Sequence, residues 1–119
     1  MTKSDDALAN LLFRSQEITL TVTGRKSGKK ISNQVWFVFE DEKLYLLPAR
    51  GSDTQWYKNV LKNPSIRVEA GSAKAELHVA PVRDAKQVKP VIEMFRAKYG
   101  DSGIRLYQKL DVAVIAQTR

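Results

Sequence analysis

The stretch TGRKSGKK, residues 23–30, concentrates positive charge where a simple hairpin turn needs none. Lysine and arginine side chains form charge-assisted hydrogen bonds with phosphate and carboxylate oxygens. Gly24 and Gly28 let the backbone turn tightly and approach a ligand, while exposed amides and the Ser27 hydroxyl can bind phosphate oxygens. The spacing is not that of a Walker A phosphate loop, and a solvated hairpin loop stays open as the other interpretation. The four cations are Arg25, Lys26, Lys29 and Lys30.

A second basic segment, PARGS at residues 48–52, ends a predicted strand immediately before a predicted helix. Helix N-termini carry partial positive charge and free N–H groups, so they suit anions. Trp56 and Tyr57 follow within one turn and can contact a flat ring; a place in the core stays open for both and is favoured more for Trp56 than for Tyr57. Two cationic, glycine-containing segments beside adjacent aromatic residues predict a flat, phosphorylated cofactor.

The composition restricts the other kinds of chemistry. The 119-residue chain has no cysteine, which excludes disulfides, thiolate metal sites and a cysteine nucleophile. One histidine, His78, cannot make a multi-histidine metal site, and we expect no metal. No serine, histidine and acid have the spacing of a recognisable triad. The formal net charge of +7 favours an anionic partner: nucleic acid, an acidic membrane surface or a phosphorylated small molecule.

The elements that must position these residues begin with six predicted strands. Short turns join neighbouring strands, and long helical crossovers between every strand are absent, so we expect an antiparallel sheet curled into a barrel. The last strand has little polar character and is expected to be central. The strands are expected at residues 18–22, 35–39, 44–47, 66–70, 75–82 and 110–116.

Three helices are expected around the strands. Ser52 and Gln55 have capping-box spacing at the start of the second helix, and Asp84 precedes the third. Pro90 lies inside the third pattern and marks either a kink or a later helix start. The apolar faces are expected to hold Leu8, Leu11 and Leu12 in the first helix, Trp56, Val60 and Leu61 in the second, and Val88, Val91, Ile92, Phe95 and Tyr99 in the third.

These elements predict an α+β fold with one domain over residues 1–119, in which a six-stranded antiparallel barrel has about three flanking helices. No apolar run approaches the roughly 20 residues needed to span a bilayer. No charged-then-apolar leader opens the chain either. We therefore expect a cytoplasmic protein.

Two segments in this order, LTVTGRKSGKK (20–30) and ARGSDTQWYKNVLKNPSIRV (49–68), resemble the deazaflavin-dependent nitroreductase family. The likeness runs from Ile18 to Val68 and fades through Tyr107. It implies a six-stranded split β-barrel, often dimeric and related to the flavin-binding pyridoxamine-phosphate-oxidase-like group. It also implies coenzyme F420, a phosphorylated 5-deazaflavin with an oligoglutamate tail, as the source of hydride for quinones, enones or nitroaromatics.

Carried onto this chain, the resemblance assigns residues to both sides of the reaction. The basic residues after strand 18–22 would meet the phosphate or acidic tail, and residues 48–51 would lie along the ring and its ribityl-phosphate arm. Tyr99 and Tyr107 fall near tyrosines that face substrate in relatives. The implied cofactor-binding residues are Arg25, Lys26, Ser27, Gly28, Lys29, Lys30, Pro48, Ala49, Arg50, Gly51, Trp56, Tyr57 and Asn59.

This chain departs from the family pattern at three places. Lys30-Ile31 stands where many relatives have Pro-Arg, a proline usual near Gln34 is missing, and residues 53–55 replace a common His-Pro pair. The contact with the phosphate is therefore expected to involve Lys29, Lys30 or Arg50.

Three alternatives stay open. Flavin mononucleotide (FMN) on the same barrel needs fewer cations, because it has a phosphate but no glutamate tail. A barrel that binds single-stranded nucleic acid would place Trp36, Phe37 and Tyr45 on an open, basic sheet face. A protein that binds or stores another ligand without turnover is the third. The resemblance also implies a homodimer; the apolar run at 35–39 agrees with one, but would look the same in a central strand.

Overall fold

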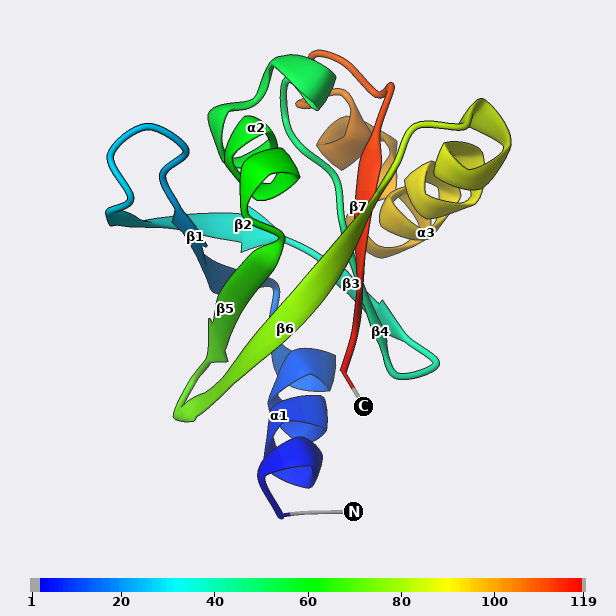
Figure 1. Ribbon diagram of the computed structural model, residues 1–119. Coiled ribbons are helices and arrows are strands. Elements are labelled where there is room, and N and C mark those ends of the chain that lie inside the picture. The colour runs from blue at the N-terminus through cyan, green and yellow to red at the C-terminus, as the bar shows by residue number, and fades with distance from the viewer. Residues whose placement is uncertain (1–2, 119) are drawn as a thin grey trace.

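The computed structural model describes residues 3–118, which form three α-helices, one short 3₁₀ helix and seven strands (Figure 1). The predicted α+β class is confirmed. Within this part of the chain, no helix is both long enough and apolar enough to cross a bilayer. In chain order the elements are α1 (Lys3–Arg14), β1 (Glu17–Thr23), β2 (Lys30–Trp36), β3 (Val38–Glu40), β4 (Lys43–Leu46), η1 (Gly51–Asp53), α2 (Gln55–Lys62), β5 (Ser65–Ala70), β6 (Ala73–Val82), α3 (Ala85–Ile104) and β7 (Ala113–Gln117).

The strands form one curled antiparallel sheet with the order β2-β1-β5-β6-β7-β4-β3 (Figure 1). The long strand β6 is shared by both halves of this sheet: residues 73–78 pair with β5, and residues 79–82 pair with β7. The predicted central position of the last strand is confirmed, because β7 lies between β6 and β4. The sheet is a half-barrel, open between β2 at one end of the order and β3 at the other.

The predicted count of six strands is wrong, because the expected strand at 35–39 belongs to two strands. β2 begins at Lys30, directly after the basic residues, and pairs with β1 along its whole length. β3 begins at Val38 and pairs with β4 at the opposite end of the sheet. The two strands meet at Phe37, whose side chain is fully buried, so the apolar pattern continues although the pairing partner changes.

Side chains from α3 bind the main chain of Phe37 at this change of partner. The Tyr99 hydroxyl accepts a hydrogen bond from the Phe37 N–H at 3.0 Å. The same hydroxyl lies 2.7 Å from the Gln16 carbonyl oxygen and 2.8 Å from that of Phe37. Lys98 Nζ donates to the Phe37 carbonyl at 2.9 Å and lies 3.7 Å from the centre of the Phe37 ring. Side chains thus replace the strand ladder in satisfying these buried polar groups.

The alternating apolar residues of the strands fill the inside of the curled sheet, and helices cover its ends. α1 and α2 lie at opposite ends, whereas α3 packs outside against β3 and β7 (Figure 1). The predicted apolar faces of α1 and α3 are confirmed by buried residues. These are Leu8 and Leu12 in α1, and Val88, Val91 and Phe95 in α3.

The predicted apolar face of α2 is partly wrong. Leu61 is 42% exposed, whereas Tyr57 is buried at 1%. With 3.6 residues per turn, a face centred on Trp56, Tyr57 and Val60 leaves Leu61 at its margin. The Tyr57 hydroxyl has no hydrogen-bond partner in the described part of the chain.

The predicted helix boundaries differ from the structure at α2. This helix begins at Gln55 with Thr54 as its N-cap, so the predicted start at Ser52 is wrong. Ser52 lies in η1, and its hydroxyl donates to the Asp111 carboxylate at 2.6 Å. The Ser52 hydroxyl is therefore bound to Asp111, far away in the chain, and does not cap the helix as the sequence pattern predicts.

The third helix starts where the sequence predicts. Asp84 is the N-cap of α3 and accepts a hydrogen bond from the Lys86 N–H at 3.0 Å. Pro90 lies inside the helix, so a later start there is wrong. The helical conformation is interrupted instead at Gly100, which has φ 79° and ψ 171°.

Replacing Tyr99 with phenylalanine is expected to destabilise the fold by about 1–3 kcal/mol, because the Phe37 N–H loses its partner. The free energy of unfolding in urea measures this cost. Tyr57→Phe is the matched control: it removes the same atom from a tyrosine that is more deeply buried than Tyr99 and whose hydroxyl has no partner. We expect no loss of stability from Tyr57→Phe. Equal losses in the two variants would contradict the role assigned to Tyr99.

Candidate functional site

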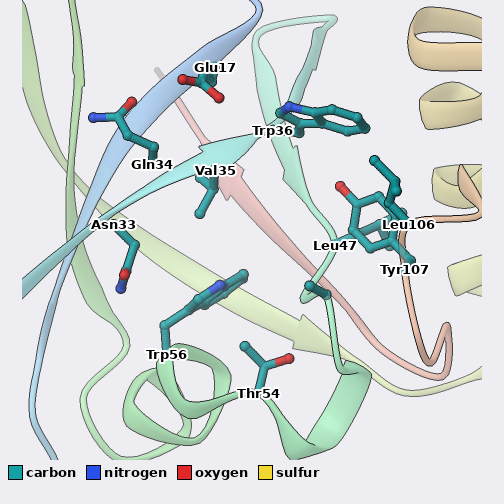
Figure 2. Close-up of a pocket in the computed structure, with 11 residues that line it drawn as sticks. Glu17, Asn33, Gln34, Val35, Trp36, Leu47, Thr54, Trp56, Leu106 and Tyr107 are labelled. Carbon is teal, nitrogen blue, oxygen red and sulfur yellow. The ribbon is translucent and has the colours of Figure 1, made fainter. Parts of the chain in front are cut away.

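A pocket of about 340 Å³ lies along the free edge of β2 (Figure 2). Small-molecule sites usually have volumes of about 300–1,000 Å³. The facing side is formed by the segment between β4 and α2, by α2 itself and by the chain after α3. The residues that line the pocket are Glu17, Asn33, Gln34, Val35, Trp36, Leu47, Ala49, Thr54, Trp56, Leu106 and Tyr107.

The pocket follows the edge of β2 rather than one face of the sheet. Side chains alternate along a strand, so Asn33 and Val35 lie on one face and Gln34 and Trp36 on the other. All four nevertheless line the pocket. Because β2 is the terminal strand of the sheet, the main-chain groups on its outer edge join no strand ladder. This edge therefore offers unpaired donors and acceptors to a ligand.

Both tryptophans of the chain line this pocket, Trp36 from β2 and Trp56 from α2, and they lie on opposite sides of it (Figure 2). The Trp36 ring stacks on Tyr99, with centroids 4.3 Å apart and planes 6° apart. Gly103 gives the indole its place, because a Cβ there would lie 3.1 Å from the Trp36 ring. The position of Trp36 thus depends on α3.

Leu106 and Tyr107 lie near Trp36 in the pocket (Figure 2). The Tyr107 ring meets Trp36 and Phe95 edge-on, with centroid distances of 6.2 and 6.1 Å. Burial raises the pKa of Tyr107 well above its usual value, and Tyr99 adds to the shift. The hydroxyl is therefore protonated at neutral pH, and Figure 2 shows it pointing into the pocket.

Tyr99, the other tyrosine that the resemblance places near substrate, does not line the pocket. Its hydroxyl contacts the main chain of Gln16 and Phe37, and its ring lies behind Trp36. Burial raises the pKa of Tyr99 to about 12. The hydrogen bond with the Phe37 main chain lowers this pKa, and the Glu17 charge adds a smaller increase. Tyr99 therefore positions Trp36.

The basic loop (residues 24–29) is closed by its own main chain. Gly24 N donates to the Lys29 carbonyl at 2.8 Å, and Gly28 N donates to the Gly24 carbonyl at 2.9 Å. Gly28 has φ 71°, a conformation that glycine adopts without strain. The Ser27 hydroxyl accepts a hydrogen bond from the Lys29 N–H at 3.2 Å, so it stabilises the turn.

Arg25 fixes the basic loop to α2. Its guanidinium donates to Asn59 Oδ1 at 2.7 Å and to Gln55 Oε1 at 2.9 Å. Its main-chain N–H donates to the same Asn59 oxygen at 3.1 Å. Asn59 is buried and does not line the pocket, so its amide holds the loop. Since both partners are neutral, the charge of Arg25 is not compensated.

The other cations beside the pocket are exposed. Lys30 Nζ donates to the Thr23 hydroxyl at 2.9 Å, again a neutral partner. None of the ion pairs formed within residues 3–118 includes a cation of the basic loop, Lys30 or Arg50. Positive charge therefore accumulates beside Asn33 and Trp56. The exposed cations are Lys26, Lys29, Lys30 and Arg50.

The Arg50 turn (residues 48–53) is held by the chain before β7. The Asp111 carboxylate accepts hydrogen bonds from the Ser52 N–H at 2.9 Å and the Ser52 hydroxyl at 2.6 Å. Burial raises the pKa of Asp111, but these hydrogen bonds and the Lys109 charge outweigh it, so the net shift is downward. Gly51 has φ 56°, and a Cβ there would lie 2.0 Å from Asp111 Oδ1. Only glycine fits this position.

The structure places the residues expected at the site in three settings. Ala49, Trp56 and Tyr107 line the pocket. Lys26, Lys29, Lys30 and Arg50 are exposed beside it, and Arg25 is half-buried against α2. Four others are buried around it: Pro48, Gly51, Tyr57 and Asn59. Sequence reasoning missed most of the β2 residues, because it started that strand at 35 and not at Lys30. The pocket residues it did not assign are Glu17, Asn33, Gln34, Val35, Trp36, Leu47, Thr54 and Leu106.

The features expected of a nucleic-acid surface or a metal site are not found in residues 3–118. Phe37 is fully buried, Trp36 is stacked on Tyr99, and Tyr45 is packed beside the α3 cluster, so they form no open aromatic face. No group of three metal-binding side chains occurs in this range. His78 is exposed on β6.

Residues 9–118 match the family model DUF2255, described as an uncharacterized protein conserved in bacteria. The chain belongs to this family. No curated protein matches the sequence.

Solved structures share the fold at low sequence identity. An F420-H2-dependent reductase (FDR-A) is 22% identical, with a TM-score of 0.68 over 86% of this chain and 94% of that chain. HutZ, the haem storage protein from Vibrio cholerae, is 15% identical, with a TM-score of 0.71 over 98% and 90%. A Listeria innocua protein provisionally assigned as a pyridoxamine 5'-phosphate oxidase is 14% identical, with a TM-score of 0.68 over 94% and 90%. The chain therefore shares its fold with these proteins.

Gly51→Ala is expected to destabilise the protein more than Gly28→Ala. Both positions have positive φ, so each alanine costs about 1–2 kcal/mol of backbone strain. At Gly28 a Cβ meets nothing within 4 Å, whereas at Gly51 it displaces Asp111 from Ser52. This loss adds about 1.5–3 kcal/mol, the value of a hydrogen bond to a charged group. Urea denaturation measures both costs, and equal values would contradict the role of Asp111.

Proposed function

We propose that the protein binds a phosphorylated deazaflavin of the coenzyme F420 type and acts as a reductase of a small planar acceptor. The observation that carries this proposal is one pocket with aromatic sides, an open strand edge and uncompensated cations at one end. The F420-H2-dependent reductase with the same fold supports the oxidoreductase class.

The pocket fits the ring of such a cofactor. Trp36 and Trp56 lie on opposite sides, and Val35 and Leu47 add apolar surface. A deazaflavin ring is flat and carries carbonyl and N–H groups on its rim. Unpaired main-chain groups along β2 can bind that rim, as they would bind a neighbouring strand. The residues that would hold the ring are Asn33, Gln34, Val35, Ala49 and Trp56.

The cations fit the anionic part of the cofactor. Lys26, Lys29 and Arg50 are exposed and belong to two separate segments, so they can meet a phosphate and an acidic tail together. Thr54, the N-cap of α2, makes no side-chain cap hydrogen bond. The first N–H groups of α2 are therefore open to a phosphate oxygen as well.

When bound, the reduced deazaflavin supplies the hydride, and the chain supplies position and protons. Trp36, Leu106 and Tyr107 exclude water around the acceptor and orient it. The protonated Tyr107 hydroxyl points into the pocket and is the group that donates the accompanying proton.

FMN is the second candidate, and the same ring pocket favours it. One phosphate needs fewer positive charges than a phosphate with several carboxylates. The spread of uncompensated cations over the basic loop and the Arg50 turn is the observation that favours the deazaflavin.

The test is a fluorescence titration of the purified protein with oxidised coenzyme F420 and, separately, with FMN. We expect the deazaflavin to bind more tightly, with an affinity that falls as salt rises, because exposed cations are screened. Light scattering on the same samples tests the homodimer that the family resemblance implies. Tighter binding of FMN would keep the fold and change the cofactor, and binding of neither would overturn the proposal.

A double variant assigns the acidic tail. Lys26→Ala with Lys29→Ala is expected to weaken binding of F420 by roughly tenfold and FMN by less, since FMN has no tail. Lys74→Ala with Lys89→Ala removes two exposed lysines elsewhere and is the matched control for net charge. Equal losses for the two cofactors would remove these lysines from the tail.

Tyr107→Phe is expected to lower turnover by roughly 10²-fold or more while cofactor affinity stays unchanged, because only the proton donor is lost. Stopped-flow oxidation of the reduced cofactor by a quinone measures the rate. Tyr45→Phe, which alters a half-buried tyrosine away from the pocket, is the control. An unaltered rate in Tyr107→Phe would reject the proton-donor role.

A further inference from the structure

Glu17 lies at the end of the pocket farthest from the basic loop. In the ladder between β1 and β2, Glu17 is directly opposite Trp36, whereas Thr23 is opposite Lys30. Directly opposite side chains share one face, with Cβ atoms about 4.5–5.5 Å apart. Six residue steps of about 3.4 Å, roughly 20 Å in all, separate the two ends of β2. The Glu17 carboxylate is thus a neighbour of the Trp36 indole, remote from Lys30.

The aromatic end of the pocket (Trp36, Leu106 and Tyr107) is an apolar surface with room for a ring. Leu106 is 68% exposed although it lines the pocket, which is unusual for a large apolar side chain. Tyr99 covers one face of Trp36 and leaves the remaining indole surface to the pocket. A planar ring that enters here gains apolar and aromatic contacts.

Glu17 forms no ion pair with a cation of the described chain. It is exposed and takes part in none of the ion pairs within residues 3–118. Lys98 of α3 also contacts this region, where its Nζ donates to the carbonyl oxygens of Ser15 and Phe37. The Glu17 charge also reaches the aromatic residues, since it contributes to the raised pKa of Tyr99. Glu17 is therefore the one carboxylate among the residues that line the pocket, and it lies at the aromatic end, whereas the unpaired cations lie beside the basic loop.

We propose that Glu17 determines the charge of the acceptor: the aromatic end takes planar rings that are neutral or cationic and rejects anionic rings. That the bound ring is a hydride acceptor rests on the proposed function, whereas the selection of rings by their charge depends only on residues of this chain. A like charge a few ångströms away, in partial contact with water, weakens binding by roughly fivefold or more. Glu17 is a specificity-determining residue in this account, and Tyr107 keeps its own role.

The experiment uses the protein without cofactor and three probes that share one ring system: 1,4-naphthoquinone, its 2-sulfonate and a trimethylammonium derivative. Trp56→Phe leaves Trp36 as the one tryptophan, so quenching of its fluorescence reports binding at the aromatic end. In the Trp56→Phe variant, half-maximal quenching of Trp36 is expected to need a concentration of the sulfonate that is roughly fivefold or more above that of the parent quinone. Added salt narrows that difference.

Glu17→Gln is expected to remove the difference between the sulfonate and the parent quinone. Glu17→Asp, which keeps the charge, should retain it. Glu76→Gln is the matched control, because it removes one exposed carboxylate from β6, outside this pocket. It should leave the difference unchanged.

Three results would overturn the proposal: equal quenching by sulfonate and parent, a difference that persists in Glu17→Gln, or no quenching of Trp36 by any probe. None of these depends on cofactor binding. A failed cofactor titration with intact charge selection would reject the deazaflavin and keep the role of Glu17. Cofactor binding without charge selection would reject the role of Glu17 and keep the deazaflavin.

Discussion

The main chain at Phe37 must find hydrogen-bond partners where one strand ends and the next begins, and much of the structure depends on how α3 supplies them. Tyr99 and Lys98 bind the N–H and carbonyl groups that no neighbouring strand reaches. The chain can therefore leave the β1 side of the sheet and pair with β4 on the other. This transfer leaves the outer edge of β2 unpaired, and the pocket lies along that edge.

The same helix sets the chemistry of the pocket. Tyr99 stacks on Trp36, and Gly103 leaves space for the indole, so the aromatic end takes its shape from residues outside the cavity. At the opposite end the loop cations depend on α2 through Arg25 and Asn59. Neutral partners hold Arg25, and Asp111 is bound to Ser52 rather than to Arg50, so the positive charge stays available to a ligand.

The sequence allowed prediction of what depends on local pattern. Alternation and turns located most strands, and charge and glycine located the basic loop and the Arg50 turn. The division at Phe37 was missed because it depends on Tyr99, 62 residues away in the chain. The two adjacent aromatics of α2 were ranked in the wrong order, because Trp56 lines the pocket and Tyr57 is buried in the core. Which of them faces the cavity depends on how the helix rotates against the sheet.

Glu17 and Leu106 had no local signal at all. Glu17 gains its place from strand register, because it is opposite Trp36. Leu106 gains its place from the break in α3 at Gly100, after which the chain turns back to the pocket. Residues of this kind are found only when the pairing and the path of the chain are known.

The long strand β6 has a consequence for how the molecule unfolds. Its first residues complete the ladder of β5, and its last residues complete that of β7, so one continuous strand joins the two halves of the sheet. The buried side chains inside the curled sheet also come from both halves. We therefore expect the two halves to unfold together, as one cooperative unit.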